Sequence, residues 1–177
     1  MNPDLTEPYR VENATMADLD FIYWLFEEAI SYQKRNNYVG WNSYDKDYIK
    51  RDIDNKLQFK IVKDDDTIMC IFSICFTDGL IWREKDKGDA IYLHRAVVNA
   101  AFKGQKMFEK MVNWITIFAR EKGLQYVRMD TWAANPHIIE YYKSYGFIFL
   151  ENYTTPNTPD LPEQHRNLTV ALLEFKL

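Results

Sequence analysis

The sequence has few cysteines and no long hydrophobic run. Its 177 residues include only two cysteines, Cys70 and Cys75, which lie in one apolar segment without metal-ligand residues beside them. We expect both to be buried, reduced thiols, as in a cytoplasmic protein. No stretch approaches about 20 consecutive apolar residues, so no segment is expected to span a membrane. The opening MNPDLTEPYR lacks a basic segment followed by an apolar one, and therefore does not predict a secretory signal.

An excess of positive charge is also absent. The chain has 22 Lys and Arg against 26 Asp and Glu, which gives a formal net charge of −4. A general nucleic-acid binder needs a basic face, so this balance argues against nucleic acid as a partner. What the sequence does contain is 47% hydrophobic and 16% aromatic residues, which is typical of a packed globular protein. The length fits one domain, residues 1–177, with enough chain for a sizeable core.

Hydrophobic periodicity predicts a mixed α/β domain. A capping-box-like signal at Thr15 and Asp18 opens a first helix, whose apolar stripe includes Ile22 and Phe26. Ser43 can cap a second, more polar helix. The other expected elements are strands at 9–13, 58–63, 68–77, 90–98, 124–132, 147–150 and 168–175, helices at 104–122 and 136–145, a tight turn at 64–67, and loops at 78–89 and 151–167. The strand-helix-strand order from 90 to 130 implies a parallel pair joined by a crossover helix.

The stretch HRAVVNAAFKGQKMFEKMV, residues 94–112, runs from an apolar strand through a loop into an amphipathic helix. Such a passage can receive an anion on the amides at the helix start. Phosphate loops are usually glycine-rich, however, and this one has only Gly104. Lys103, Lys106 and Lys110 share one edge of the helix start, where cations oppose the helix dipole unless a polyanion binds there. From the residues alone, a solvated lysine edge and a phosphate site both stay open.

The segments VVNAAFKGQKMF and NPHIIEYYKSYGF together resemble the Gcn5-related N-acetyltransferase (GNAT) family. That family carries a V-x-P-x-Y-R-G-x-G-x-G/A type segment, followed at a distance by N-x-x-A-x-x-x-Y-x-x-x-G-F. Lys106 and Phe108 depart from the first pattern, because small residues normally stand at both positions. The matching positions are Val98, Ala100 for the proline, Phe102 for the tyrosine, Lys103 for the arginine, Gly104, Asn135, Tyr142, Gly146 and Phe147. The expected order of elements agrees with the family's fold over nearly the whole chain.

The resemblance implies a GNAT-like α/β (α+β) fold: a mixed, mostly antiparallel sheet with a central parallel strand pair, flanked by helices on both faces. It also implies acetyl-CoA as co-substrate, with the pantetheine arm along the end of the strand at 90–98. The residues that the resemblance assigns to acetyl-CoA are Ala96 and Val98 for the arm, Lys103, Gly104, Gln105, Lys106 and Met107 for the pyrophosphate, and Asn135.

Tyr142 is the catalytic acid that the resemblance implies. It lies seven residues after Asn135, two helical turns on and on the same face. In many GNAT enzymes this tyrosine lies near the thioester sulfur and protonates the departing thiolate. The alternative is an aromatic core residue, for which Tyr141 and Tyr145 compete.

His94 is the candidate base. An amine acceptor arrives as an ammonium ion and must lose a proton before attack, and a histidine pKa of ~6.5 suits that transfer. Histone acetyltransferases of the family carry a glutamate base at this place. A regular strand would put His94 and Val98 on one face, although a bulge would shift that parity. A hydrogen-bonded structural histidine, or a water chain without a dedicated base, stays open as an alternative.

The acceptor is expected to meet the first two helices, where Trp24, Glu27 and Glu28 are candidate ligands for an ammonium ion. The alternative is core packing for the tryptophan and a solvated face for the glutamates. His137 is expected on the surface, and His165 would touch a ligand only if the long loop folds over the cleft. No two histidines have metal-ligand spacing together with a nearby carboxylate, so no metal is expected.

These features lead to one functional hypothesis and one rival. The hypothesis is a cytoplasmic, acetyl-CoA-dependent N-acetyltransferase that acts on a small-molecule or peptide amine, without nucleic-acid or membrane partners; a homodimer is compatible with the fold. The rival is a catalytically inactive GNAT-like module that senses acyl-CoA or another small ligand, and Lys106 and Phe108 motivate it.

Overall fold

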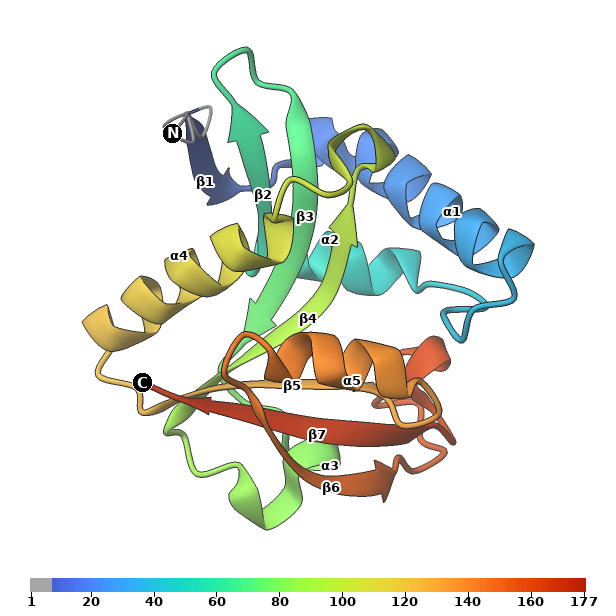
Figure 1. Ribbon diagram of the computed structural model, residues 1–177, viewed down its shortest axis with the longest axis vertical. Helices are drawn as coiled ribbons and strands as arrows, with labels where there is room; N and C mark the ends of the chain where they lie inside the picture. Colours follow the sequence, from blue (N-terminus) through green and yellow to red (C-terminus); the bar gives the residue numbers. More distant parts are fainter. Residues whose placement is uncertain (1–7) are drawn as a thin grey trace.

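The computed structural model describes residues 8–177, which form a seven-stranded sheet with helices on both faces (Figure 1). The strands are β1 (Tyr9–Asn13), β2 (Gln58–Lys63), β3 (Ile68–Cys75), β4 (Ala90–Val98), β5 (Tyr126–Trp132), β6 (Ile148–Thr154) and β7 (Thr169–Lys176). Their order in the sheet is β1-β2-β3-β4-β5-β7-β6. Neighbouring strands are antiparallel except for the central parallel pair β4–β5. The predicted fold class is confirmed.

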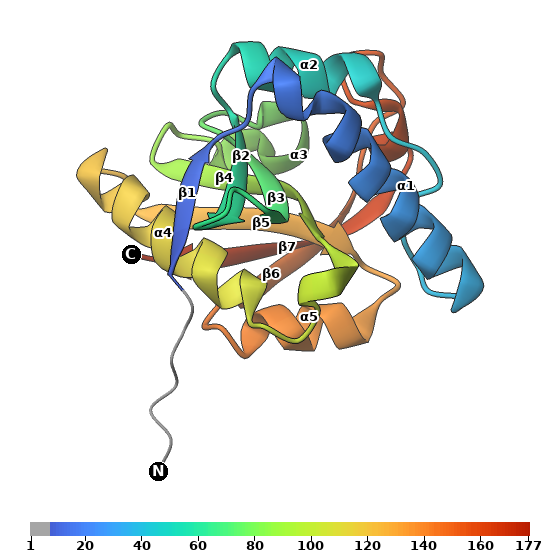
Figure 2. The same cartoon turned by 90° about the horizontal axis from the view of Figure 1, so that it is seen from above.

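The helices divide between the two faces of this sheet (Figure 2). They are α1 (Leu19–Arg35), α2 (Lys46–Asp54), α3 (Gly79–Trp82), α4 (Met107–Glu121) and α5 (Pro136–Lys143). Ile22 of α1 and Ile49 of α2 share a buried apolar cluster with Val97 of β4. On the opposite face, Met111 of α4 packs in a second cluster with Leu93 of β4. The predicted apolar stripes of α1 and α4 therefore do face the sheet, because burying one face is what stabilises an amphipathic helix. Among the described helices, none combines the length and apolar character that a membrane span requires.

The capping signal of α1 is confirmed, whereas that of α2 is corrected. The Asp18 carboxylate accepts a hydrogen bond from the Thr15 backbone N–H at 2.8 Å, and a short 3-10 turn at Met16–Asp18 leads into α1. For α2 the predicted cap Ser43 is wrong. Asp45 caps the helix instead, because its Oδ1 accepts from the Tyr48 backbone N–H at 3.0 Å.

The segment 78–89, predicted as a loop, contains α3 and a 3-10 turn at Arg83–Lys85. Ile81 and Trp82 are fully buried beneath the sheet, where they pack with Tyr92 of β4. The charged residues after Trp82 give the segment the composition of a loop, so the sequence does not predict the short apolar helical turn before them. Burial of two large side chains accounts for the helical turn.

Several boundaries differ from the predictions by one or two residues, and two differ by more. The helix α4 begins at Met107, three residues later than expected, because Lys106 before it has a left-handed backbone conformation. The strand β6 continues to Thr154, where it still pairs with Thr169 of β7. The predicted helix stop at Gly123 is confirmed, since this residue has a positive φ of 72° directly after α4.

The strands β4 and β5 separate after a short parallel contact. Their pairing runs from Ala90 opposite Tyr126 to Leu93 opposite Met129, and it does not continue to the later residues of either strand. Beyond this point no strand within residues 8–177 pairs with the edge of β4 that faces β5. Its backbone groups are therefore available to another partner.

A β-bulge lies at the same place in β4. Between two register points, β4 advances three residues, from His94 to Val97, while β3 advances two, from Ser73 to Ile71. Arg95 within this step has a positive φ of 49°. The bulge shifts the alternation of side chains, so the expectation that His94 and Val98 share one face of a regular strand is wrong.

Candidate active site

A cavity of about 680 Å³ lies where β4 and β5 separate, bounded by α1, the loop before α4, and α5. Most of the predicted site residues meet in it. Those that line it are Trp24, Glu28, His94, Ala96, Val98, Lys103, Gly104, Lys106, Met107, Asn135 and Tyr142. Gln105 and Glu27 lie outside the lining, and the Glu27 carboxylate accepts a hydrogen bond from the Tyr44 hydroxyl at 2.8 Å.

The loop before α4 contains two residues with positive φ. Gly104 has a φ of 83°, and no heavy atom of the described part of the chain lies within 4 Å of where a Cβ would stand, so backbone conformation rather than crowding favours glycine there. Lys106 has φ 54° and ψ 40° at the N-cap of α4. A side chain other than glycine costs roughly 1–2 kcal/mol in this left-handed region. Lys106 thus takes the backbone geometry for which a glycine is the less strained choice.

The start of α4 offers free backbone donors to the cavity. The amides of Met107, Phe108 and Glu109 have no carbonyl partner within the helix, because the first amides of any helix lack one. The amides of Lys103 and Gln105, by contrast, donate to carbonyls of the preceding turn at 3.2 Å each. The anion-binding capacity of the loop therefore lies at its end rather than along its whole length.

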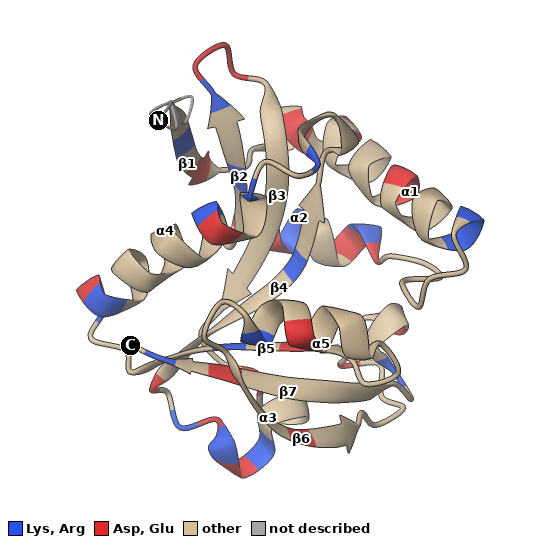
Figure 3. Cartoon of the chain, in the orientation of Figure 1, with Lys and Arg blue, Asp and Glu red and all other residues tan. Residues whose placement is uncertain are grey.

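Both loop lysines already have partners. The Lys103 ammonium donates to the Tyr32 hydroxyl and lies 4.2 Å from the centre of that ring, so it reaches across to α1. The Lys106 Nζ lies 3.9 Å from the Glu109 carboxylate, and acidic and basic residues stand side by side at the start of α4 (Figure 3). The Lys106 side chain is exposed, so it can turn toward an anion without breaking a buried pair.

Tyr142 faces the cavity from α5. Its ring packs 4.8 Å from the Phe108 ring, centre to centre, and Phe108 itself turns into the core as a buried member of the α4 stripe. Burial raises the pKa of the Tyr142 phenol, and the negative charge of Asp130 raises it further. The phenol therefore keeps its proton at neutral pH. Asn135, two turns earlier, caps α5 by accepting from the Ile138 N–H at 3.2 Å.

Aromatic side chains line the opposite side of the cavity. Trp24 of α1 is 43% exposed, which leaves much of its ring open to a ligand. Trp41 packs edge-on against Trp132 of β5 at 5.6 Å between ring centres. Glu28 is the carboxylate that α1 contributes to this side.

His94 lies between two carboxylates at the point where the strands separate. Its Nε2 is 3.2 Å from Asp78 Oδ2, and its Nδ1 is 3.5 Å from Asp130 Oδ1. Burial alone would lower the pKa of His94, but the neighbouring Cys75 and Asp78 raise that pKa well above its usual value. Burial raises the pKa of Asp130 to about 6, against the lowering effect of the His94 charge. Two groups with shifted pKa values, His94 and Asp130, thus meet at one point of the site.

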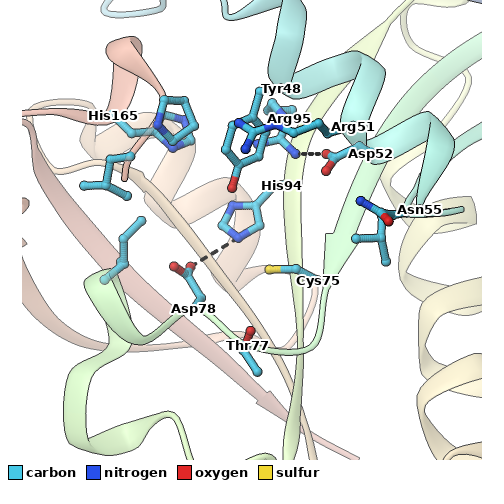
Figure 4. A pocket seen from close by; sticks show the side chains of 14 residues that line it. Tyr48, Arg51, Asp52, Asn55, Cys75, Thr77, Asp78, His94, Arg95 and His165 are labelled. Atoms are coloured by element: carbon cyan, nitrogen blue, oxygen red, sulfur yellow. Dashed lines mark hydrogen bonds and ion pairs between the residues drawn. The ribbon is translucent and has the colours of Figure 1, made fainter. Parts of the chain in front are cut away.

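A second, smaller cavity of about 260 Å³ lies on the other side of His94 (Figure 4). Asp78 and Cys75 line it, together with Arg95, whose guanidinium forms an ion pair with Asp52 of α2. His165 also lines it, so the long loop before β7 does fold over the site. Burial lowers the pKa of His165 to about 3, which keeps its imidazole neutral. His94, Arg95 and His165 line both cavities and form the wall between them.

Sequence reasoning missed the carboxylates of this cluster. Asp130 carried one usable signal: it is an acidic residue inside the apolar strand LQYVRMDTW, and the parallel pairing of β4 and β5 puts it level with His94. Nothing in the sequence indicated a functional role for Asp78, because it lies in a charged segment whose composition is typical of a loop. The position of Asp78 depends on α3, a short helix that the composition of this segment does not predict.

Asp78, His94 and Asp130 also place possible ligand atoms within 4.8 Å of one another, a spacing that a metal ion could use. The two carboxylates, however, approach opposite nitrogens of the imidazole ring. An ion bound at one nitrogen would face only one of them at bonding distance. The arrangement fits an ionic cluster better than a metal centre, and the absence of a metal stays a prediction.

Comparison with solved structures identifies the fold as that of acetyltransferases. A GNAT acetyltransferase from Listeria monocytogenes 4b F2365 superimposes with a TM-score of 0.79 at 20% identity, covering 96% of this chain and 95% of the other. The ribosomal-protein-S18-alanine N-acetyltransferase from Escherichia coli gives 0.65 at 11% identity, with coverages of 96% and 94%. A chimera of spermidine N-acetyltransferase SpeG from Vibrio cholerae and hSSAT gives 0.66 at 11%, with 95% of each chain covered. No curated protein matches the chain.

The family is established by the sequence itself. The model of the acetyltransferase (GNAT) family matches residues 19–147. The chain therefore belongs to the GNAT acetyltransferase family, and the predicted resemblance is confirmed. Membership implies acetyl transfer from acetyl-CoA to an amine as the kind of reaction.

Proposed function

We propose that this protein transfers the acetyl group of acetyl-CoA to a primary amine of a small molecule or peptide. The observation that carries the proposal is the single cavity that joins the start of α4, the gap between β4 and β5, and Tyr142. A phosphate group, a thioester and a proton donor can therefore be accommodated along one continuous wall.

Acetyl-CoA would lie along β4. Backbone groups of Ala96 and Val98 stand beyond the last β4–β5 pair, where an extended pantetheine arm can satisfy them as a neighbouring strand would. The pyrophosphate would meet the first amides of α4, with Lys106 supplying charge. Lys103 can add charge only by leaving its contact with Tyr32.

Tyr142 would act when the carbon–sulfur bond breaks. The amine nitrogen attacks the thioester carbon, the bond to sulfur breaks, and the departing thiolate takes the phenolic proton. The raised pKa of Tyr142 guarantees that this proton is present at neutral pH. The ammonium form of the acceptor must lose a proton first, and His94 and Asp130 are titratable groups that line the same cavity.

The acceptor would enter past Trp24 and Glu28, which offer an aromatic face and a carboxylate to a cation. The structural relatives are named for a ribosomal-protein alanine and for spermidine, two very different amines. Their likeness therefore supports amine acetylation without choosing an acceptor. Cytoplasmic location and a homodimer stay predictions.

The first test is thermal unfolding with and without acetyl-CoA, followed by thiol release with a panel of primary amines. Acetyl-CoA at about 100 times its Kd should add about 2.7 kcal/mol to the free energy of unfolding, and adenosine should not. Tyr142→Phe should lower thiol release 10²-fold or more, in keeping with the loss of a general acid worth roughly 10²–10⁴, while the acetyl-CoA shift persists. Tyr141→Phe, on the same helix, is the matched control.

A second candidate function is an acyl-CoA sensor without catalysis. The observation that favours it is the altered loop, in which Lys106 and Phe108 replace small residues. Stabilisation by acetyl-CoA without thiol release for any amine would support the sensor. Absence of any stabilisation at millimolar acetyl-CoA would contradict the enzyme and the acyl-CoA sensor alike, and would favour a module that binds another small ligand.

A further inference from the structure

The geometry of His94 leaves neither ring nitrogen free for a substrate. Each nitrogen faces a carboxylate oxygen, Nε2 toward Asp78 at 3.2 Å and Nδ1 toward Asp130 at 3.5 Å. The side chain is only 10% exposed, so it cannot turn toward the cavity without leaving both partners. A group that must accept a proton from a ligand needs a lone pair directed at that ligand. His94 does not meet this condition.

Asp130 does meet it. It is the first residue of β5 beyond the last parallel pair with β4, so it stands where the two strands open. It lines the large cavity with Tyr142, whereas Asp78 lines the small one. Its side chain is 9% exposed, and its buried Oδ1 faces His94 Nδ1 at 3.5 Å without a hydrogen bond within the described residues. The contact with His94 is therefore ionic, and the carboxylate is not fully compensated by hydrogen bonds.

We propose that Asp130 takes the proton from the ammonium ion of the acceptor, and that His94, held by Asp78, is a positioning residue for that carboxylate. The inference rests on the proposed acetyltransferase function and names the base that this reaction uses. It replaces His94, the base expected from the sequence, by its neighbour on β5.

The proton balance is simple. One N–H bond of the ammonium ion breaks and an O–H bond forms on Asp130, which leaves a neutral amine and a neutral carboxylic acid. After attack, the second nitrogen-bound proton passes to the Tyr142 phenolate, which has just protonated the thiolate. Asp130 then releases its proton to solvent when the products leave. Overall, one ammonium ion and one thioester give an amide, a thiol and one proton.

The charges around Asp130 set the pH at which it can act. His94 and Arg95 face it from β4 and lower its pKa, Asp78 faces it from the segment before α3 and raises it, and the neutral Tyr142 faces it from α5. Burial is the largest influence, and the resulting pKa is about 6. Asp130 is therefore ionised and able to accept a proton above this pH. His94, whose pKa is raised by Cys75 and Asp78, stays a cation to a higher pH than an ordinary histidine.

The first experiment measures these ionisations in the ligand-free protein. The Asp130 carboxyl carbon, assigned by its loss in Asp130→Asn, should titrate near pH 6 in a carbon NMR titration. The His94 imidazole should keep protons on both nitrogens, in a nitrogen-edited spectrum, at a pH where an ordinary histidine has lost one. A His94 that titrates between pH 6 and 7, beside an Asp130 already ionised at pH 4.5, would overturn the proposal.

The second experiment uses kcat/KM against pH with an amine that the thiol-release panel finds active. For the wild type, kcat/KM should rise with pH along an acidic limb whose apparent pKa is near 6. Asp130→Asn should lose that limb and fall by roughly 10²–10⁴ in rate, with its acetyl-CoA thermal shift intact. His94→Gln should keep the limb but move it upward by about one unit or more, because the carboxylate loses a stabilising cation. The exposed Asp160→Asn is the control.

The outcomes distinguish an error in the assignment of the base from a failure of the proposed acetyltransferase function. If wild type acetylates amines but Asp130→Asn retains the limb and rate within threefold, only the assignment of the base is wrong. If His94→Gln abolishes the limb instead, the histidine is the base. If wild type acetylates no amine, the proposed function fails and the assignment falls with it.

Discussion

At the scale of single residues, Lys106 combines backbone strain with a positive charge at the helix start. Its left-handed conformation, with φ 54°, costs roughly 1–2 kcal/mol for a side chain with a Cβ. Its cationic head also opposes the positive end of the α4 dipole. An anion bound at the helix start would offset both unfavourable contributions, because the lysine then attracts the anion and a glycine would not.

Lys106→Gly and Lys106→Gln should separate these two contributions. The glycine variant should raise the free energy of unfolding by roughly 0.5–1 kcal/mol, since relief of strain exceeds the added chain entropy. The glutamine variant keeps the strain and should leave stability within about 0.5 kcal/mol of wild type. Both should weaken acetyl-CoA binding at low salt and less so at high salt. Unchanged binding in both variants would mean that Lys106 meets no anion.

The positions of site residues that the sequence could predict are those set by spacing within one helix or loop. Asn135 and Tyr142 are seven residues apart on one helix, so their shared direction toward the cavity follows from helical geometry. The cluster of Asp78, His94 and Asp130 could not be predicted in this way. It joins three separate segments, and its arrangement depends on a bulge and on a hidden helix.

At the scale of elements, the bulge in β4 is fixed by an ion pair with α2. Arg95, the residue with positive φ, directs its guanidinium to Asp52, and the two side chains are 7% and 9% exposed. Burial raises the pKa of Asp52, while the positive charge of Arg95 lowers it. The ion pair connects α2 to β4 at the bulge, where the alternation of side chains along β4 shifts.

Removing one partner of this pair should destabilise the protein strongly. Asp52→Ala should lower the free energy of unfolding by about 3–5 kcal/mol, because it leaves a buried guanidinium without its counter-charge. Asp54→Ala, an exposed position of the same helix, is the matched control and should change it by less than about 0.5 kcal/mol. Urea denaturation measures both.

A double replacement tests whether the uncompensated buried charge causes the loss of stability. Asp52→Leu with Arg95→Met should recover much of the lost stability, since an apolar pair avoids the buried charge. A cost below about 1 kcal/mol for Asp52→Ala would contradict the role given to this pair.

Elements with a strong periodic signal were predicted well, and short ones were not. The long apolar stripe of α4 and the apolar runs of β3 and β4 gave clear patterns, because each element buries a whole face. The four residues of α3 are too few to show a helical period. The cap of α2 was placed two residues early because Ser43 and Asp45 are equally good caps, and only the fold chooses between them.

At the scale of the whole molecule, the sheet consists of two parts that meet at a short seam. The strands β1 to β4 form one part and β5, β7 and β6 the other. They share a parallel contact from Ala90–Tyr126 to Leu93–Met129, whereas β5 pairs with β7 along its whole length. The gap beyond the seam is where the pantetheine arm is proposed to lie.

Hydrogen exchange should reveal this division. Amides of residues 94–98 and 130–132 that face the gap should exchange faster than those of β3 and β7 in the free protein, because a missing strand leaves them without partners. Acetyl-CoA should slow the residues of β4 that border the gap. No change on ligand addition, despite a clear thermal shift, would place the arm elsewhere.

The wall between the two cavities has a further consequence. Because His94, Arg95 and His165 line both, a molecule bound in the smaller cavity would touch residues that also shape the larger one. Thermodynamic linkage then requires the effect to be reciprocal: whatever factor such a molecule applies to the affinity for acetyl-CoA, acetyl-CoA applies to the affinity for that molecule. A molecule in the smaller cavity would therefore contact the same three side chains that border the larger one.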